Sequence, residues 1–121
     1  MSSWRGERIA EIRGRLVAND EGALWLLFLD DPYGEPIFAS AIDGAMAEMD
    51  AQLTRNVAAI INELGVKAVL LAVPRRDGRP LSVDRQLWSD LQILVDSSTE
   101  LVDLLVVGRE SFWSARETTA A

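Results

Sequence analysis

Histidine and cysteine are both absent from this chain of 121 residues. Their absence excludes a Ser-His-Asp triad, a cysteine nucleophile, a disulfide framework and every zinc site that is built on imidazole or thiolate. The nucleotide-binding motif GxGxxG is also absent, as is GxxxxGK followed by Ser or Thr. The composition therefore argues against an enzyme, and we expect neither a metal nor a cofactor.

Long apolar runs are absent as well. The longest uninterrupted run, Ala23–Leu29, is far shorter than the roughly 18 residues that indicate a membrane span. The first residues, MSSWRGERIAEIRGR, lack the apolar segment of a secretion signal. We therefore expect a cytoplasmic protein that does not associate with a membrane.

Basic residues are outnumbered: 12 Lys and Arg stand against 19 Asp and Glu, for a net charge of −7. A nucleic-acid-binding protein needs cationic surface to displace counterions from phosphates, so this balance disfavours nucleic acid as a partner. The charge is unevenly distributed, because residues 19–66 carry a net charge of −8 and residues 67–85 carry +3. The positive segment is therefore the first place to look for contact with an anion.

A chain of this length forms one domain around a single core. We interpret residues 1–18 as an amphipathic N-terminal helix, residues 23–116 as the core of the domain and residues 117–121 as a flexible tail. The apolar residues that define the first helix are Trp4, Ile9, Ile12, Leu16 and Val17.

A hairpin and a long helix are predicted next. Ala23–Leu29 and Pro36–Ala41 are typical of paired strands, joined by a type I turn at Asp31–Gly34. Asp43 is placed to cap a helix that Gly65 ends. The apolar stripe of this helix consists of Met46, Met49, Leu53, Val57, Ile60, Ile61 and Leu64.

The second half of the chain alternates strands and a helix. Val66–Val73 is apolar almost throughout and predicts a central strand buried on both faces. A loop over Pro74–Pro80 leads to a helix that Ser82 caps and that continues to Val95. Two further strands are expected over Leu101–Val107 and Ser111–Ser114. The order α-β-β-α-β-α-β-β predicts an α/β protein, a single-domain α-β-α sandwich with a mixed sheet.

Two segments resemble the C-terminal domain of RadC-like proteins, which belong to the JAMM/MPN superfamily of metalloprotease-like domains. In LLAVPRRDGRPLSVDRQLW, Pro74, Pro80 and Asp84 match the family's HNHPSG loop and the Pro-Ser-x-x-Asp that opens the next helix. LVDLLVVGRESFWSARE is similar to the family's LDHIIIG, followed by an aromatic residue and Ser-x-x-Glu. With LWLLFLD upstream, the resemblance covers about residues 24–117 and implies the deaminase-like architecture of that superfamily.

The resemblance also indicates what this chain lacks. In the family, the two His of HNH and the Asp bind zinc, and an upstream Glu acts on the metal-bound water. Here the His positions fall on Leu71 and Val73, so Asp84 alone remains of the three ligands, while Glu21 lies near the place of the catalytic Glu. The resemblance therefore implies a metal-free pseudoenzyme, and such members resemble scaffolds and dimerisation partners.

Five residues are candidates for contact with a ligand or a partner. Arg75, Arg76 and Arg79 precede a helix N-terminus, where they form either an anion site or a solvated basic loop. Trp4 and Trp113 lie near the ends of the domain and serve either as anchors for a protein partner or as core residues.

Two acidic residues also have alternative roles. Asp84 lies in the first turn of a helix, where it either interacts favourably with the helix dipole or acts as a metal ligand. Asp103 lies inside an apolar strand, so it is exposed or paired with an Arg unless it is a catalytic acid.

The favoured hypothesis is a protein–protein interaction or dimerisation module, whose partner is another protein or a second copy of the chain. The alternative is a domain that binds a small anion or an acidic ligand through Arg75, Arg76 and Arg79. Less favoured are a metallohydrolase with a rebuilt carboxylate site around Asp84 and a DNA-associated factor.

Overall fold

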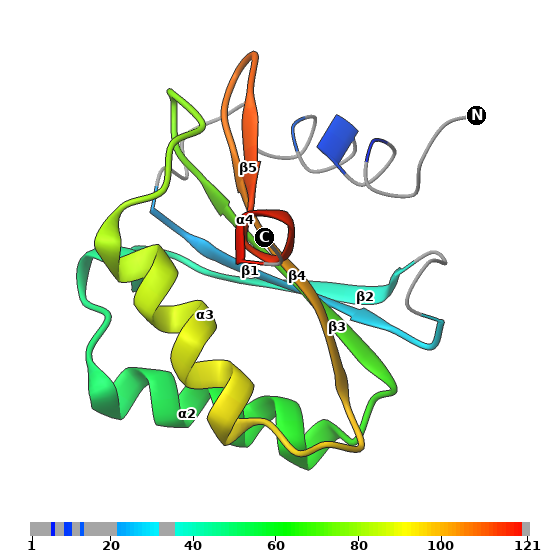
Figure 1. The fold of residues 1–121 in the computed structure, drawn as a ribbon. Helices are drawn as coiled ribbons and strands as arrows, with labels where there is room; N and C mark the ends of the chain where they lie inside the picture. The colour runs from blue at the N-terminus through cyan, green and yellow to red at the C-terminus, as the bar shows by residue number, and fades with distance from the viewer. Residues whose placement is uncertain (1–5, 7–8, 11–12, 14–21, 32–35, 120–121) are drawn as a thin grey trace.

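The computed structural model describes residues 6, 9–10, 13, 22–31 and 36–119. Within them lies a five-stranded sheet with the strand order β2-β1-β3-β4-β5 (Figure 1). The strands are β1 (Leu24–Leu29), β2 (Pro36–Ile42), β3 (Ala68–Pro74), β4 (Glu100–Val107) and β5 (Phe112–Ser114). β3 and β4 are parallel and the other neighbouring pairs are antiparallel, so the predicted α/β class with a mixed sheet is confirmed.

The helices that follow residue 44 are η1 (Ala45–Ala47, a single 3₁₀ turn), α2 (Ala51–Leu64), α3 (Ser82–Leu94) and α4 (Ala115–Thr119). α2 and α3 lie side by side on one face of the sheet (Figure 1). α4 is helical as far as Thr119, whereas the sequence predicts a flexible tail that begins at Glu117. In the part of the chain that the structure describes, no helix combines the length and apolar character needed to cross a bilayer.

β3 is the centre of the core. Its residues from Ala68 to Val73 are 0% exposed, because side chains on both of its faces are covered. Val69, Leu71 and Val73 pack into the cluster that includes α2 and α3. The alternate residues pack into a second cluster on the other face, together with Ile9. The prediction of a central strand buried on both faces is confirmed.

The N-terminal segment is only partly described. Gly6, Ile9, Ala10 and Arg13 are helical, in agreement with the predicted first helix, and the side chain of Ile9 is buried against the sheet. The predicted positions of Trp4, Ile12, Leu16, Val17 and Glu21 lie outside the described residues, as does most of the predicted turn at Asp31–Gly34.

The predicted start of the long helix is wrong. α2 begins at Ala51, and its N-cap is Asp50, whose side chain accepts a hydrogen bond from the Leu53 amide at 2.8 Å. Asp43 instead precedes Gly44, which has a φ of 68° and turns the chain. The Met46 amide then donates to the Gly22 carbonyl at 2.9 Å, so this segment is tied to the start of β1 rather than continued into a helix.

The sequence signal at the end of α2 is confirmed, and the one at the start of α3 is not. Gly65 caps α2 in the left-handed conformation, with a φ of 61°, as predicted. Ile60 and Leu64 were expected in the core, but they are 43% and 46% exposed. Ser82 is the first residue of α3 and not its cap, because Leu81 occupies the N-cap position. The Leu81 amide donates a hydrogen bond to the Asp84 carboxylate.

We predict that Asp50→Ala lowers the free energy of unfolding by about 1 kcal/mol, because the Leu53 amide loses its acceptor. Thermal denaturation followed by circular dichroism should show a fall in Tm of about 4 °C. Asp43→Ala is the matched control and should change the stability by less than about 0.5 kcal/mol. Equal losses in the two variants would contradict this start of α2.

Candidate functional site

The predicted binding loop lies at the carboxyl ends of the parallel strands β3 and β4, the place where open α/β sheets bind their ligands. The loop between β3 and α3 meets the turn between β4 and β5 here (Figure 1). The Arg75 amide donates to the Val107 carbonyl at 3.1 Å, and the Arg109 amide donates to the Arg76 carbonyl at 3.3 Å. The basic loop is therefore attached along its backbone to the end of β4.

Two glycines bring these loops into backbone contact. A Cβ on Gly108 would lie 2.4 Å from the Gly78 nitrogen, and a Cβ on Gly78 would lie 2.4 Å from the Ser111 hydroxyl oxygen. Gly78 also has a φ of 66°, which L side chains rarely adopt. The Ser111 hydroxyl donates to the Asp77 carbonyl at 2.9 Å. Backbone atoms thus fill the space between the two loops.

Arg13 joins the N-terminal segment to the same place. Its Nε donates to the Gly108 carbonyl at 2.8 Å, and its Nη2 donates to the Ser111 carbonyl at 3.3 Å. A guanidinium from the start of the chain therefore binds the turn between β4 and β5. Sequence reasoning missed this contact, because nothing local relates residues that are 95 and 98 positions apart.

Arg75 and Asp84 form a bidentate ion pair. Nε of Arg75 lies 2.7 Å from Oδ2 of Asp84, and Nη2 lies 2.7 Å from Oδ1. The Asp84 side chain is 0% exposed and that of Arg75 is 11% exposed, so both charges are largely removed from water. Oδ2 also accepts the Leu81 amide at 2.8 Å. The carboxylate therefore receives three hydrogen bonds from the loop and from the start of α3.

The two positions that match the family's zinc-binding His are in the core. Leu71 and Val73 are both 0% exposed and pack on the side of β3 that α2 and α3 cover. Neither side chain carries a donor atom for a metal. Over the described residues, no group of three or more Asp or Glu side chains is placed to hold a metal ion.

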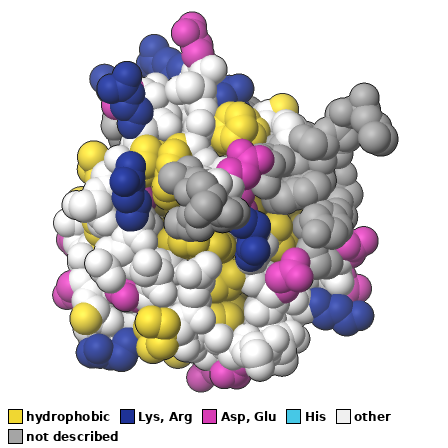
Figure 2. Space-filling model, viewed as in Figure 1, with side chains coloured by type: hydrophobic (Ala, Val, Ile, Leu, Met, Phe, Trp, Pro, Cys, Tyr) yellow, Lys and Arg dark blue, Asp and Glu magenta, His cyan; other side chains and the backbone are white. Residues whose placement is uncertain are grey.

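The three arginines of the predicted anion site do not share one environment. Arg75 is directed to Asp84, whereas Arg76 and Arg79 are exposed. Arg79 donates its backbone amide to Asp77 Oδ1 at 3.0 Å, which shapes the turn of the loop. Figure 2 shows Lys and Arg side chains around the top of the molecule, where the two loops of Figure 1 end. The structure thus shows that Arg75 binds a carboxylate of the same chain.

Asp103 is buried and bound by several donors. Its side chain is 0% exposed. Oδ1 accepts the amides of Leu104 at 2.8 Å and of Arg116 at 3.0 Å. Oδ2 accepts a short hydrogen bond from the Ser114 hydroxyl. Asp103 is thus not exposed, and the donors named here are two backbone amides and a hydroxyl, where the sequence predicted exposure or pairing with an arginine. Sequence reasoning missed both Ser114 and the amide of Arg116 as its partners.

Arg116 covers an irregularity in β4. Val69 pairs with Leu101, but Leu70 pairs with Asp103, so Val102 is the extra residue of a bulge. The guanidinium of Arg116 donates to the carbonyls of both Leu101 and Val102, the latter at 2.7 Å. Arg116 therefore satisfies two backbone acceptors that face the same edge of β4.

Trp113, the described member of the predicted pair of anchors, is partly buried and packs against the main core. The Cζ atom of Arg85 lies 5.6 Å from the centre of its ring, within the range of a cation–π contact. Phe112, its neighbour on β5, is 43% exposed. Trp113 thus packs against the core and also lies near the surface, which fits both a core residue and an anchor for a protein partner.

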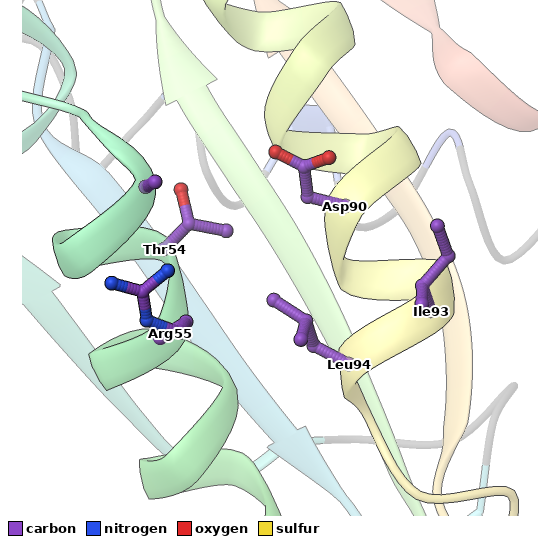
Figure 3. A pocket seen from close by; sticks show the side chains of 6 residues that line it. Thr54, Arg55, Asp90, Ile93 and Leu94 are labelled. Atoms are coloured by element: carbon purple, nitrogen blue, oxygen red, sulfur yellow. The ribbon is translucent and has the colours of Figure 1, made fainter.

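A shallow groove between α2 and α3 is a surface feature that the sequence did not predict (Figure 3). Its volume is about 250 Å³. Ile93 at its rim is 83% exposed. The groove is lined by Ala51, Thr54, Arg55, Asp90, Ile93 and Leu94.

No model of a known protein family matches this chain, and a comparison with curated proteins finds no relative of it. The resemblance to RadC-like proteins stays a prediction from the sequence. The site is therefore interpreted from its own geometry.

We predict that Arg75→Met lowers the free energy of unfolding by about 3 kcal/mol, because it leaves the carboxylate of Asp84 buried without a cation. Chemical denaturation of Arg75→Met, Asp84→Asn and the double variant measures the coupling between the two side chains. The double variant should lose at least about 1 kcal/mol less than the sum of the single variants. Arg79→Met is the matched control from the same loop, with an expected loss below about 0.5 kcal/mol. Additive losses would contradict the ion pair.

Proposed function

We propose that this chain is a metal-free, catalytically inactive RadC/JAMM-like domain that acts as a protein–protein interaction or dimerisation module. The observation that carries the proposal is the bidentate ion pair between Arg75 and Asp84. In the family pattern, Asp84 is the remaining ligand of a three-residue zinc site. Here both oxygens of its carboxylate bind a guanidinium that belongs to the same chain.

The ion pair supports the metal-free state for an electrostatic reason. A buried carboxylate is stabilised by a nearby cation, and Arg75 supplies a permanent one to Asp84 at 2.7 Å. A metal ion at Asp84 would have to displace two charge-assisted hydrogen bonds and the Leu81 amide. The side chains of Leu71 and Val73 would offer it no compensating ligand.

Exposed apolar side chains support the role in interaction. They occur on the edge strands β2 and β5, in the loop before α3 and on the helices α2 and α3. A single exposed apolar residue is normal, but here several lie on the two terminal strands of the described sheet and on the helices that pack against it. The large ones are Ile37, Phe38, Ile60, Leu64, Leu81, Ile93, Leu94 and Phe112, which are 37% to 83% exposed.

The binding of a small anion through Arg75, Arg76 and Arg79 is the weaker proposal. Arg75 already binds a carboxylate, and that carboxylate also occupies the Leu81 amide at the start of α3. Two of the groups that would attract an anion to this helix start are thus engaged by Asp84. A hydrolase built on Asp84 would meet the same obstacle.

We predict that tag-free protein binds no stoichiometric zinc, because Arg75 holds the carboxylate of Asp84. Isothermal titration with zinc chloride, together with metal analysis of the purified protein, measures this. A His tag must be absent, since the chain itself has no His. Saturable binding of one zinc ion that is lost in Asp84→Asn would overturn the metal-free proposal and make peptidase assays the next step.

We predict that the immobilised chain retains a protein partner, or a second copy of itself, in stoichiometric amount. Trp113→Ala should reduce the retained amount, because large aromatic residues dominate interface energies. Glu63→Ala, at an exposed charged residue of α2, is the control and should retain the partner. Circular dichroism checks that both variants are folded. A folded wild-type chain that retains neither another protein nor itself would contradict the role in interaction.

A further inference from the structure

The charges of the chain are unevenly placed in the fold. The structure describes nine basic and fourteen acidic side chains. Six of the basic ones, but only three of the acidic ones, lie in the loop between β3 and α3, at the start of α3 and in the turn between β4 and β5, if Arg13, which binds that turn, is included. This end of the sheet therefore carries a net charge of +3, whereas the other described residues carry −8 (Figure 2). The six are Arg13, Arg75, Arg76, Arg79, Arg85 and Arg109, and the three are Asp77, Asp84 and Glu110.

Two of these arginines are brought together by the contact between the loops. Arg79 directly follows Gly78, and Arg109 directly follows Gly108, and the backbones of the two glycines touch. Both arginines are exposed, and within the described residues neither guanidinium forms an ion pair. Asp77 lies in the same loop, but its Oδ1 accepts the backbone amide of Arg79. The two positive charges are therefore available to a carboxylate from outside the chain.

Apolar side chains lie beside the basic ones. Leu81 is 53% exposed, and the Arg85 amide donates to its carbonyl at 3.3 Å, so the two residues are neighbours one helical turn apart. Arg85 in turn lies over the ring of Trp113. A guanidinium on an aromatic ring still has donors at its edge for a carboxylate. We call Arg79, Leu81, Arg85, Arg109 and Trp113 the sheet-end surface.

We propose that the sheet-end surface binds an acidic segment of a partner protein, in which Asp or Glu residues stand next to large apolar ones. The inference rests on the proposed function, since it names the chemistry of the partner. Carboxylates of the segment bind the guanidinium groups of Arg79 and Arg109, whose planar donor sets match a carboxylate. Apolar side chains of the segment cover Leu81 and the exposed part of Trp113.

The surroundings favour a protein segment over other anions. A long nucleic acid would extend past the sheet-end surface toward the rest of the molecule, whose negative charge repels it. A free phosphate needs several donors that converge on one point, but the backbone amides of Leu81 and Arg79 already bind Asp84 and Asp77. A short segment that lies across the surface needs only side-chain donors and also covers the apolar groups.

An array of synthetic peptides tests the chemistry of the partner. The probes are short peptides that combine Glu with Leu or Phe at varied spacings. Two matched sets carry Gln in place of Glu, or Ser in place of the apolar residues. We expect the labelled full chain to bind peptides of the first set at least about fivefold better than their counterparts in either matched set. Equal binding to the Gln set or to the Ser set would overturn the inference, as would binding to no peptide.

Two double variants of equal net charge test the location. Arg79→Glu with Arg109→Glu reverses the charge of the sheet-end surface, and Arg55→Glu with Lys67→Glu makes the same change at exposed residues elsewhere. Fluorescence anisotropy with the best peptide of the array measures the dissociation constant, and circular dichroism checks the fold. We expect an increase of about tenfold in the first variant and of less than about threefold in the second. Equal increases would overturn the inference, because general repulsion would then explain both.

Two further probes distinguish the other occupants. A labelled oligothymidylate should bind more weakly than the best peptide, and inorganic phosphate should displace that peptide no better than sodium chloride of equal ionic strength. Tighter binding of the oligonucleotide, or specific displacement by phosphate, would overturn the inference in favour of that anion. If the capture experiment retains a protein equally well with the wild type and with the Arg79→Glu, Arg109→Glu variant, this inference fails while the proposed function stands.

Discussion

The ion pair between Arg75 and Asp84 determines the structure of the sheet end at which β3 and β4 finish. A carboxylate with no exposed surface is stable only when a cation, hydrogen-bond donors or both replace its water. Arg75 provides the cation. Its backbone amide donates to the Val107 carbonyl and so extends the hydrogen bonding between β3 and β4. Asp84 also receives the Leu81 amide and so defines where α3 begins. A strand end, a loop and a helix start thus depend on one pair of side chains.

The second buried carboxylate is stabilised in a different way. Asp103 receives two backbone amides and the hydroxyl of Ser114, all of them from β4 and the segment after it. The same segment carries Arg116, whose guanidinium covers the carbonyls at the bulge of β4. The last described residues therefore complete the hydrogen bonding of a strand whose opposite side pairs with β3. They stabilise the interior and provide donors to both oxygens of the Asp103 carboxylate.

Those parts of the fold that depend on local pattern were predictable from the sequence. Continuous apolar character identified β3 as the buried centre, and Gly65 marked the end of α2. Asp43 and Asp50 are equally good caps by residue type, and the choice between them depends on the hydrogen bond between Met46 and Gly22, a contact between distant segments. The partners of the buried carboxylates were missed for the same reason. Arg75 was assigned to an external anion because the sequence does not show that Asp84 faces it.

The two guanidinium contacts at the ends of the chain differ in the order in which they can form. Arg116 reaches carbonyls 14 and 15 residues earlier, so its loop closes at small entropic cost. Arg13 reaches carbonyls that lie 95 and 98 residues later. During synthesis, Arg13 leaves the ribosome long before its acceptors exist. Both contacts need residues near the end of the chain, but the contact of Arg116 closes a short loop and that of Arg13 a long one. We therefore expect Arg116 to reach its carbonyls faster than Arg13 does once the whole chain is free.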